Sequence, residues 1–343
     1  MSSQKGILLI NLGTPNSPDP KDVKAYLTQF LLDKYVIDYP WLLRQLLVRS
    51  IIIPKRYKES AANYSKIWDK EKGSPLLYYG KSLAQKLQHL TQDTYRVALA
   101  MRYQSPSIAE ALQDLLHHKV EEIVVFPLYP QYAMSCTETA FVEVDKFIQK
   151  HAPATKVIKI FDFFDHPAYI DALCEEVAKF DISSYDHILF SYHGVPLRHI
   201  RKGDSSGTHC LQSEHCCTKI SEVNRFCYKA QCLHTTKAIV QRLRLTSGTY
   251  SDCFQSRLGK EEWIQPYTSD ILAALARQGK KKILVISPAF TADCLETLYE
   301  ISEEYKHEFV GYGGEILDKV SCVNDSDTWT KGILQIIEAN QQQ

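Results

Sequence analysis

Apolar runs alternate with amphipathic stretches along the whole chain. Short runs rich in aliphatic and aromatic residues predict strands at 6–13, 95–103, 121–130, 155–163, 185–194, 249–259, 281–290 and 314–323. Apolar positions spaced three and four apart predict helices at 22–32, 74–90, 107–118, 137–151, 235–244, 269–278, 294–306 and 331–340. Continuous apolar strands separated by amphipathic helices are typical of parallel sheets covered on both faces.

This pattern predicts an α/β protein with two doubly wound, Rossmann-like domains. A chain of 343 residues is long for a single core, and the alternation of strands and helices starts again in the second half. We place the domains at 1–175 and 176–343, with the boundary somewhere in 170–182. The last helix is expected to pack back on the first domain.

The charge balance and the hydropathy of the chain argue against a nucleic-acid-binding protein and against a membrane-spanning one. Forty basic residues balance forty acidic ones, and no basic stripe with interleaved aromatics is present, so a nucleic-acid partner is not expected. The longest apolar stretch, 41–53, contains two arginines and is shorter than the about 20 residues that a membrane-spanning helix needs. The N-terminal run shows no cleavage-site pattern, so we expect a cytoplasmic protein.

The segment 203–232 breaks the pattern, because it has almost no periodic apolar face yet is rich in cysteine and histidine. In a reducing compartment such a group more often binds metal than forms disulfides, and a bound metal would supply the stability that a core does not. Five further cysteines lie in predicted strands or helices and are interpreted as small buried hydrophobic residues: Cys136, Cys174, Cys253, Cys294 and Cys322.

Ligands of open α/β sheets bind beyond the carboxyl ends of the strands. His193 follows one apolar strand, and Glu296 lies where a helix begins after another. Such a histidine is often only a hydrogen-bonded structural residue, and such a glutamate is often only a carboxylate favoured by the helix dipole. As a pair, however, they can take up protons or hold a divalent metal. Phosphate-binding glycine loops are missing, which favours a large flat apolar ligand with anionic groups over a nucleotide.

Six strings, in order over nearly the whole chain, resemble ferrochelatase. They are LLINLGTP, MRYQSPSI, FPLYPQYAMSCTE, FSYHGVPLRHIRKGD, CFQSRLGKEEWIQPYTSD and PAFTADCLETLYEI. The resemblance implies a chelatase fold with a porphyrin cleft between its two domains. It also implies insertion of Fe(II) into protoporphyrin IX, the terminal step of haem biosynthesis.

The resemblance carries roles onto matching residues. The family's catalytic histidine and acidic residue fall on His193 and Glu296, which are also expected to contact the substrate iron. The expected porphyrin-binding residues are Arg56, Tyr64, Ser74, Arg102, Tyr103 and Trp263. The stretch 31–53 resembles the apolar lip over which porphyrin enters. It is compatible either with peripheral contact with the inner face of the membrane or with a buried helix.

The insertion at 203–232 resembles the internal segment with which some bacterial ferrochelatases hold a [2Fe–2S] cluster. Its implied ligands are Cys210, Cys216, Cys217 and Cys227, with Cys232 as a substitute for one of them. Structural zinc, held by thiolates with His209 or His215, is the alternative.

Two other functions stay open at this point. A related enzyme could act on coproporphyrin III or on another tetrapyrrole, and an iron–sulfur sensor could keep the fold without the activity. The presence of both His193 and Glu296 argues against the sensor. The oligomeric state is not readable from the sequence.

Overall fold

The structure is a computed structural model that describes residues 5–92, 94–257, 259 and 261–341. It contains two compact units. Unit 1 comprises residues up to Tyr129, Met134–Phe161 and the end of the chain from Ile337, and unit 2 comprises Pro130–Ala133 and Asp162–Ile336. The division therefore falls earlier than the predicted 170–182, because the helix that follows Phe161 packs on a helix of unit 2.

Unit 1 is built on a parallel sheet. In the described residues its strands are β1 (Lys5–Gly13), β2 (Tyr95–Tyr103), β3 (Glu122–Pro127) and β4 (Lys156–Lys159), in the order β2-β1-β3-β4. The central strand β1 is buried over most of its length, as expected for a strand covered on both faces. All four strands coincide with predicted apolar runs.

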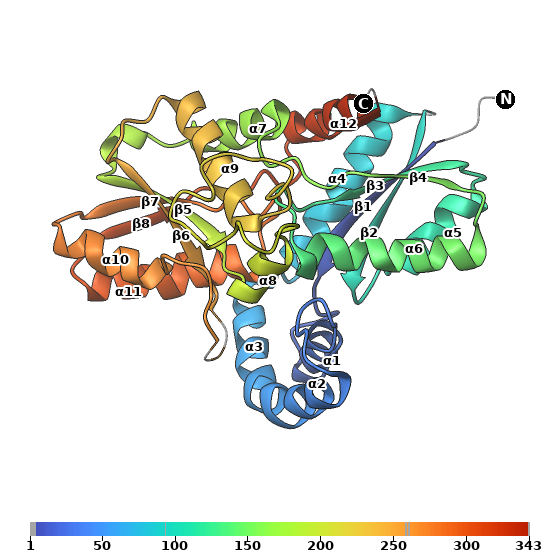
Figure 1. The fold of residues 1–343 in the computed structure, drawn as a ribbon, viewed down its shortest axis with the longest axis horizontal. Helices are drawn as coiled ribbons and strands as arrows, with labels where there is room; N and C mark the ends of the chain where they lie inside the picture. The colour runs from blue at the N-terminus through green and yellow to red at the C-terminus, as the bar shows by residue number, and fades with distance from the viewer. Residues whose placement is uncertain (1–4, 93, 258, 260, 342–343) are drawn as a thin grey trace. The chain divides into compact units, whose positions relative to one another are not determined.

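Helices cover both faces of this sheet. Helix α4 (Pro75–Thr91) lies on one face, and α5 (Ile108–His117) and α6 (Thr139–His151) lie on the other (Figure 1). Helix α5 begins with a capping box, in which Ser107 and Glu110 satisfy each other's backbone N–H groups. A short π-helix, η2 (Met134–Glu138), precedes α6.

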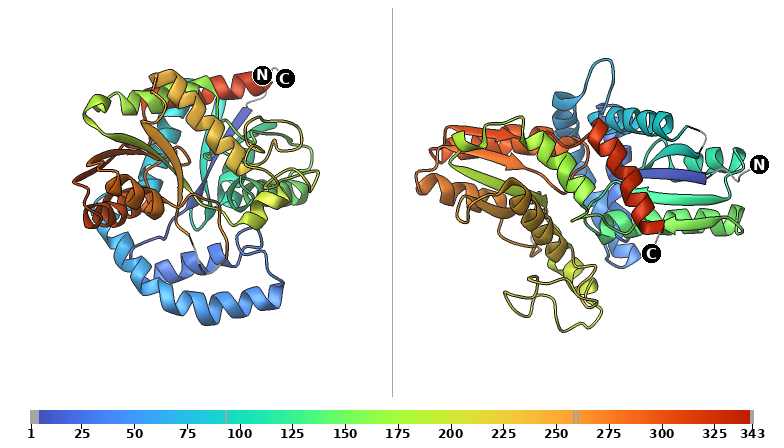
Figure 2. Two further views of the ribbon diagram at one scale, coloured as in Figure 1. Left: turned by 60° about the vertical axis from the view of Figure 1, so that its left-hand side comes forward. Right: turned by 90° about the horizontal axis from the view of Figure 1, so that it is seen from above.

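A helical extension projects from unit 1 beyond β1 (Figure 1). It consists of α1 (Pro20–Leu31), α2 (Trp41–Leu47), the π-helix η1 (Val48–Ile52) and α3 (Ile53–Ile67). From α2 to α3 the chain forms one nearly continuous helical path (Figure 2). Leu31, Ile37, Val48 and Ile53 form its small apolar core.

Unit 2 repeats the same sheet topology. In the described residues its parallel strands are β5 (His187–His193), β6 (Tyr250–Gln255), β7 (Lys282–Ile286) and β8 (Ile316–Lys319), in the order β6-β5-β7-β8. Helices α7 (Pro167–Val177) and α9 (Tyr228–Leu243) lie on one face, and α10 (Thr268–Arg277) and α11 (Lys306–Gly311) lie on the other (Figure 1). The remaining elements are the 3-10 helix η3 (Ile182–Ser184), α8 (Leu197–Lys202), the π-helix η4 (Glu296–Tyr305) and α12 (Asp327–Gln341), whose residues from Ile337 belong to unit 1.

The cysteine-rich segment between α8 and α9 contains no helix or strand in the structure. It forms an irregular loop that extends beyond the start of α9 (Figure 2). This agrees with the absence of a periodic apolar face in its sequence.

Candidate active site and cysteine cluster

His193 is the last residue of β5, and its imidazole is half-buried. Its Nδ1 lies 2.6 Å from the carbonyl oxygen of Gly194. Because a carbonyl only accepts, this contact assigns the hydrogen of a neutral imidazole to Nδ1 and leaves Nε2 as the basic nitrogen. Two apolar rings flank the imidazole, Trp263 and Phe290, each with its centroid 6.3 Å away.

Glu296 lies at the same end of the sheet, where η4 begins. Gln255, the last residue of β6, is the register partner of His193, and its Nε2 donates to the carbonyl oxygen of Glu296 (3.1 Å). One buried amide side chain therefore connects the strand position beside His193 to the residue at the start of η4.

A second carboxyl group, Glu300, follows Glu296 along η4. It accepts hydrogen bonds from Ser256 and Gln255. Burial, reinforced by the charge of Glu296, raises the pKa of Glu300 to about 8, so this group holds a proton at neutral pH. Glu300 is not among the residues predicted from the sequence, although the i, i+4 spacing of Glu296, Glu300 and Glu304 places them along one helical face.

A buried ion pair supports the start of η4. Asp293 contacts Lys319 at 2.5 Å, and its carboxylate also accepts from Thr297 and Asn324. These contacts hold the residues immediately before Glu296, because Asp293 and Lys319 are both almost fully buried.

Arg102 and Tyr103, at the end of β2, converge on Asp33. The Arg102 guanidinium donates to Asp33 at 2.6 Å, and the Tyr103 hydroxyl donates to the same oxygen at 2.9 Å. The Asp33 carboxylate is 5% exposed, which makes this a buried pair. Their predicted contact with porphyrin carboxylates stays a prediction, and Asp33 is a partner that the sequence pattern did not reveal.

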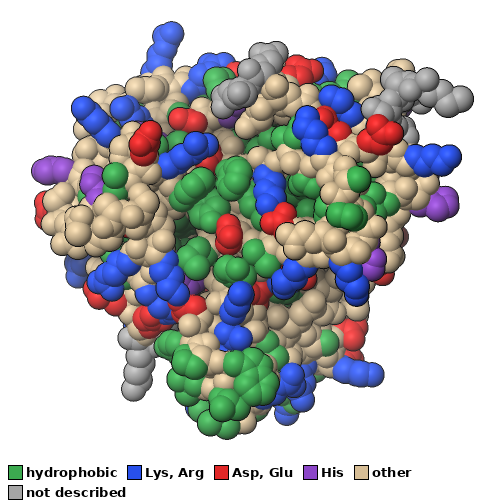
Figure 3. All heavy atoms as spheres, turned by 45° about the vertical axis from the view of Figure 1, so that its right-hand side comes forward, with side chains coloured by type: hydrophobic (Ala, Val, Ile, Leu, Met, Phe, Trp, Pro, Cys, Tyr) green, Lys and Arg blue, Asp and Glu red, His purple; other side chains and the backbone are tan. Residues whose placement is uncertain are grey.

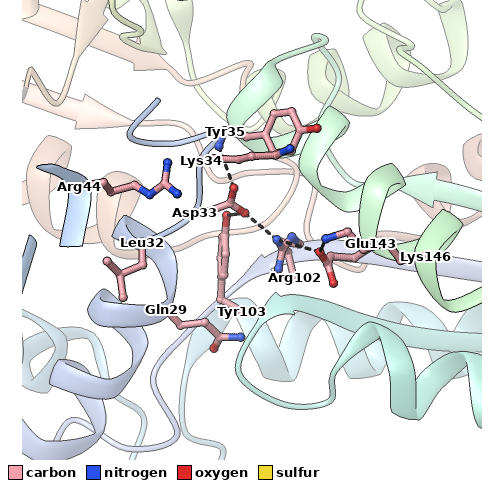
Figure 4. Close-up of a pocket in the computed structure, with 10 residues that line it drawn as sticks. All are labelled: Gln29, Leu32, Asp33, Lys34, Tyr35, Arg44, Arg102, Tyr103, Glu143 and Lys146. Atoms are coloured by element: carbon pink, nitrogen blue, oxygen red, sulfur yellow. Dashed lines mark hydrogen bonds and ion pairs between the residues drawn. The ribbon is translucent and has the colours of Figure 1, made fainter. Parts of the chain in front are cut away.

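These residues line a pocket of about 440 Å³ (Figure 4). Its two carboxylates are paired, Asp33 with Arg102 and Glu143 with Lys146. Lys34 and Arg44 add positive charge, and the Arg44 guanidinium also donates to the carbonyls of Ile37 and Tyr39. The pocket therefore carries a net positive charge and suits an anionic group.

The other predicted porphyrin-binding residues of unit 1 lie apart from this pocket lining. Ser74 precedes α4, and its hydroxyl lies 2.8 Å from that of Thr14, just after β1. Tyr64 is buried in α3 with its ring edge-on to Tyr26. Arg56 is exposed on the same helix. Trp263, like His193 and Glu296, belongs to unit 2.

The predicted lip exposes large apolar side chains at the tip of the helical extension. Helix α2 buries none of its residues, and Leu42 is 73% exposed. Figure 3 shows these side chains gathered at the lower edge of the molecule. The patch comprises Tyr39, Trp41, Leu42, Leu43, Leu46 and Ile51. Among the described residues, no helix combines the length and the apolar character needed to cross a bilayer.

Four thiols of the insertion lie together. The Sγ atoms of Cys216 and Cys217 are 3.6 Å apart, and the Cys227 thiol interacts with those of Cys217 and Cys210. Hydrogen bonding from Cys217, with the backbone N–H groups of Ala230 and Lys229, lowers the pKa of Cys227 to about 6. In the described chain, no group of three or more His, Cys, Asp or Glu side chains is arranged to hold a single metal ion.

The remaining candidate ligands differ from these four. The Cys232 thiol is buried in α9, where burial raises its pKa well above the usual value. The His209 ring contacts the Cys216 carbonyl oxygen through Nε2 (3.0 Å), and His215 is exposed. Four gathered thiols are a suitable ligand set for a [2Fe–2S] cluster.

Asp204 organises the loop that leads to Cys210. One carboxylate oxygen accepts from the backbone N–H groups of His209 and Cys210, and the other accepts from Ser206 and Gly207. The N–H of Cys210 is the main reason that the pKa of Asp204 lies well below its usual range. The turn is thus fixed by a charged acceptor directly before the first cysteine.

Comparisons with known proteins agree with this fold. The family model described as ferrochelatase matches residues 4–341. Curated ferrochelatases of Stutzerimonas stutzeri and Azotobacter vinelandii are 42% and 44% identical, over 97% and 96% of this chain and 97% of each relative.

Among solved structures, SirB from Bacillus subtilis with Fe3+ superimposes with a TM-score of 0.53 at 10% identity. The superposition covers 98% of this chain and 95% of SirB. At that identity, the likeness shows only the shared fold. The family match and the curated relatives carry the assignment: the chain belongs to the ferrochelatase family, the enzymes that insert iron into protoporphyrin IX.

Proposed function

We propose that, in this ferrochelatase, His193 accepts a proton from the porphyrin and Glu296 binds the incoming iron. The observation that carries the proposal is the shared position of the two residues at the carboxyl end of one sheet, linked through Gln255. Insertion of Fe(II) into free-base protoporphyrin IX breaks two pyrrole N–H bonds and releases two protons. The reaction therefore needs a base that takes up protons and a ligand that binds the incoming iron.

The geometry of each residue suits its role. The Gly194 carbonyl holds the Nδ1 side of the His193 ring, so Nε2 presents its lone pair to the substrate. Glu300 can pass protons onward from Glu296, because it exchanges its proton near neutral pH. Trp263 and Phe290 flank the imidazole with apolar surface, which suits a flat apolar macrocycle.

Replacing His193 with Ala tests the proposal. We expect kcat for Fe(II) insertion to fall about 10²- to 10⁴-fold, with porphyrin binding retained. His118→Ala, at an exposed histidine of unit 1, is the control and should keep parental turnover. Both proteins are assayed with protoporphyrin IX and with coproporphyrin III. Near-normal metallation by His193→Ala would refute the role of His193 as the base.

We also propose that the insertion holds a [2Fe–2S] cluster on Cys210, Cys216, Cys217 and Cys227. The gathering of these four thiols supports this set over one that contains Cys232. A bound cluster would tie together a segment that contains no helix or strand.

The cluster is tested on protein purified without oxygen. We expect visible absorption that bleaches on reduction, together with equal amounts of iron and acid-labile sulfide. Cys227→Ser should lose this absorption, and Cys232→Ser should keep it. One equivalent of zinc, or a colourless protein without metal, would refute the cluster.

A third proposal concerns the lip. We propose that the exposed apolar patch rests on a lipid surface, with the substrate entering from that side. The exposure of α2 and the positive charge of the pocket lined by Lys34 and Arg44 support it.

A further inference from the structure

Strand β5, which ends at His193, accepts a hydrogen bond from Tyr228, the residue after Cys227. The Tyr228 hydroxyl donates to the backbone carbonyl oxygen of His193 at 2.9 Å. Pairing of β5 with β7 ends at Phe190, so this carbonyl lies beyond that ladder. The Tyr228 hydroxyl therefore donates on the side where β7 no longer pairs, while the other side of His193 pairs with Gln255 of β6, and the Tyr228 ring is buried.

Tyr228 directly follows one of the four gathered cysteines, Cys227, in the chain. It is the first residue of α9, and Cys227 is the residue that caps this helix. The Gln231 N–H donates to the Cys227 carbonyl oxygen at 3.0 Å, which makes Cys227 the start of the helical hydrogen-bond ladder. A metal bound to the Cys227 thiolate would thus hold the first turn of α9 and the Tyr228 ring with it.

The other end of the insertion is attached to the same strand end. After His193 the chain passes through α8 to Gly203, where a Cβ atom would lie only 3.0 Å from the carbonyl oxygen of Phe226. The N–H of Ser205 also donates to the Val223 carbonyl oxygen at 3.3 Å. The insertion thus leaves and returns side by side, next to Cys227.

We propose that Tyr228 is a positioning residue that couples the metal centre of the insertion to His193. With the centre bound, α9 begins at a fixed place and the Tyr228 hydroxyl holds the His193 carbonyl, so the imidazole keeps its direction. Without the centre, the first turn of α9 loosens and His193 loses this support. The inference rests on the proposed roles of His193 and of the cysteine cluster.

Tyr228→Phe removes only the hydroxyl. We expect the metal centre and the thermal stability to be retained, kcat to fall about tenfold, and the KM for porphyrin to stay within about twofold. Tyr169→Phe is the matched control, because the Tyr169 hydroxyl also makes a buried 2.9 Å hydrogen bond to a carbonyl, that of Pro288. It should keep the parental kcat. Parental kcat in Tyr228→Phe would overturn the inference.

Coupling is tested by removing the metal with a chelator. In the parent, kcat should fall about tenfold, and in Tyr228→Phe it should hardly change further, because the link is already broken. Equal responses of the two proteins, or no response of the parent, would overturn the coupling.

Hydrogen exchange gives a readout that does not depend on activity. Backbone amides of residues 192–195 should exchange faster after metal removal, and also in metal-loaded Tyr228→Phe, but not in loaded Tyr169→Phe. Unchanged exchange in both cases would overturn the inference. If His193→Ala abolishes turnover while Tyr228→Phe does not affect it, only the inference fails. If His193→Ala stays active, the proposed function itself fails.

Discussion

Asp162 is a half-buried residue whose carboxylate is connected to the insertion through Gln231. It accepts a hydrogen bond from Gln231, whose amide also donates to the Arg225 carbonyl oxygen. Burial raises the pKa of Asp162 from 3.8 to about 6, although the positive charge of Arg225 opposes the shift. The folded chain therefore binds a proton at this site more tightly than the unfolded chain does.

This site gives a pH dependence with a definite sign. Since the folded pKa lies above the unfolded one, stability falls as the pH rises from about 4 through 6, by at most about 3 kcal/mol. Asp162→Asn removes the titrating group and keeps an acceptor for Gln231. We expect the variant to match the parent near pH 4 and to be more stable at pH 8, as measured by urea unfolding. Equal stability at both pH values would contradict this.

The sequence predicts which residues carry the chemical groups of the site, but it does not predict which residues those groups contact. MRY at 101–103 indicated Arg102 and Tyr103, yet Asp33, which holds both, lies sixty-nine positions from Arg102 in the chain. Glu300 differs from Asp33, because its i, i+4 spacing from Glu296 can be read in the sequence. Its raised pKa comes from burial and from a neighbouring charge, and both depend on packing. Local sequence patterns therefore predict which residues belong to the site. The ionisation state of those residues depends on contacts made by the folded chain.

The predicted secondary structure is confirmed where a single sequence pattern dominates. Each predicted strand is present, because continuous apolar runs have few alternatives to a parallel sheet covered on both faces. Helices α3, α7, α8 and α11 were not predicted. Helix α3 is largely polar, α7 begins at a proline, and α8 and α11 have only six residues each. The helix predicted at 294–306 is mainly the π-helix η4, whose wider turn leaves no simple signature in the sequence.

Helix α2 is exposed enough for its leucines to be replaced without unfolding the chain. Because it buries no residue, Leu42→Asp combined with Leu43→Asp should change the free energy of unfolding by less than about 1 kcal/mol. Binding to vesicles that contain anionic lipid should weaken at least about tenfold, since each leucine would otherwise bury apolar surface in the bilayer interface. Co-sedimentation with vesicles measures the binding.

Leu90 supplies the control for this pair. It is exposed on α4 of the same unit but does not belong to the lip patch. Leu90→Asp should keep the parental binding to vesicles. If the double variant binds as well as Leu90→Asp does, the lip is not the lipid-binding surface.

The two units share a sheet topology but carry different candidate functional residues. Both sheets place their first strand second in the order, with helices on both faces. Unit 2 alone carries His193, Glu296 and the cysteine cluster, whereas unit 1 carries the lip and the positively charged pocket. Unit 2 therefore combines the shared α/β fold with the cysteine-rich insertion, and we expect the stability of this insertion to depend on a bound metal.

Limited proteolysis can separate the stability that buried apolar side chains give the sheets from the stability that a bound metal would give the insertion. The sheets are held by buried apolar side chains, but residues 203–227 contain no helix or strand, so metal removal should open this segment first. Trypsin should then cut after Lys219 and Arg225 at least about tenfold faster than in the metal-loaded chain. Cleavage after Lys119, in an exposed turn that follows α5, should not change. Mass spectrometry of the early fragments measures both rates. If Lys219 and Arg225 are cut equally fast with and without metal, the thiols do not hold a stabilising centre.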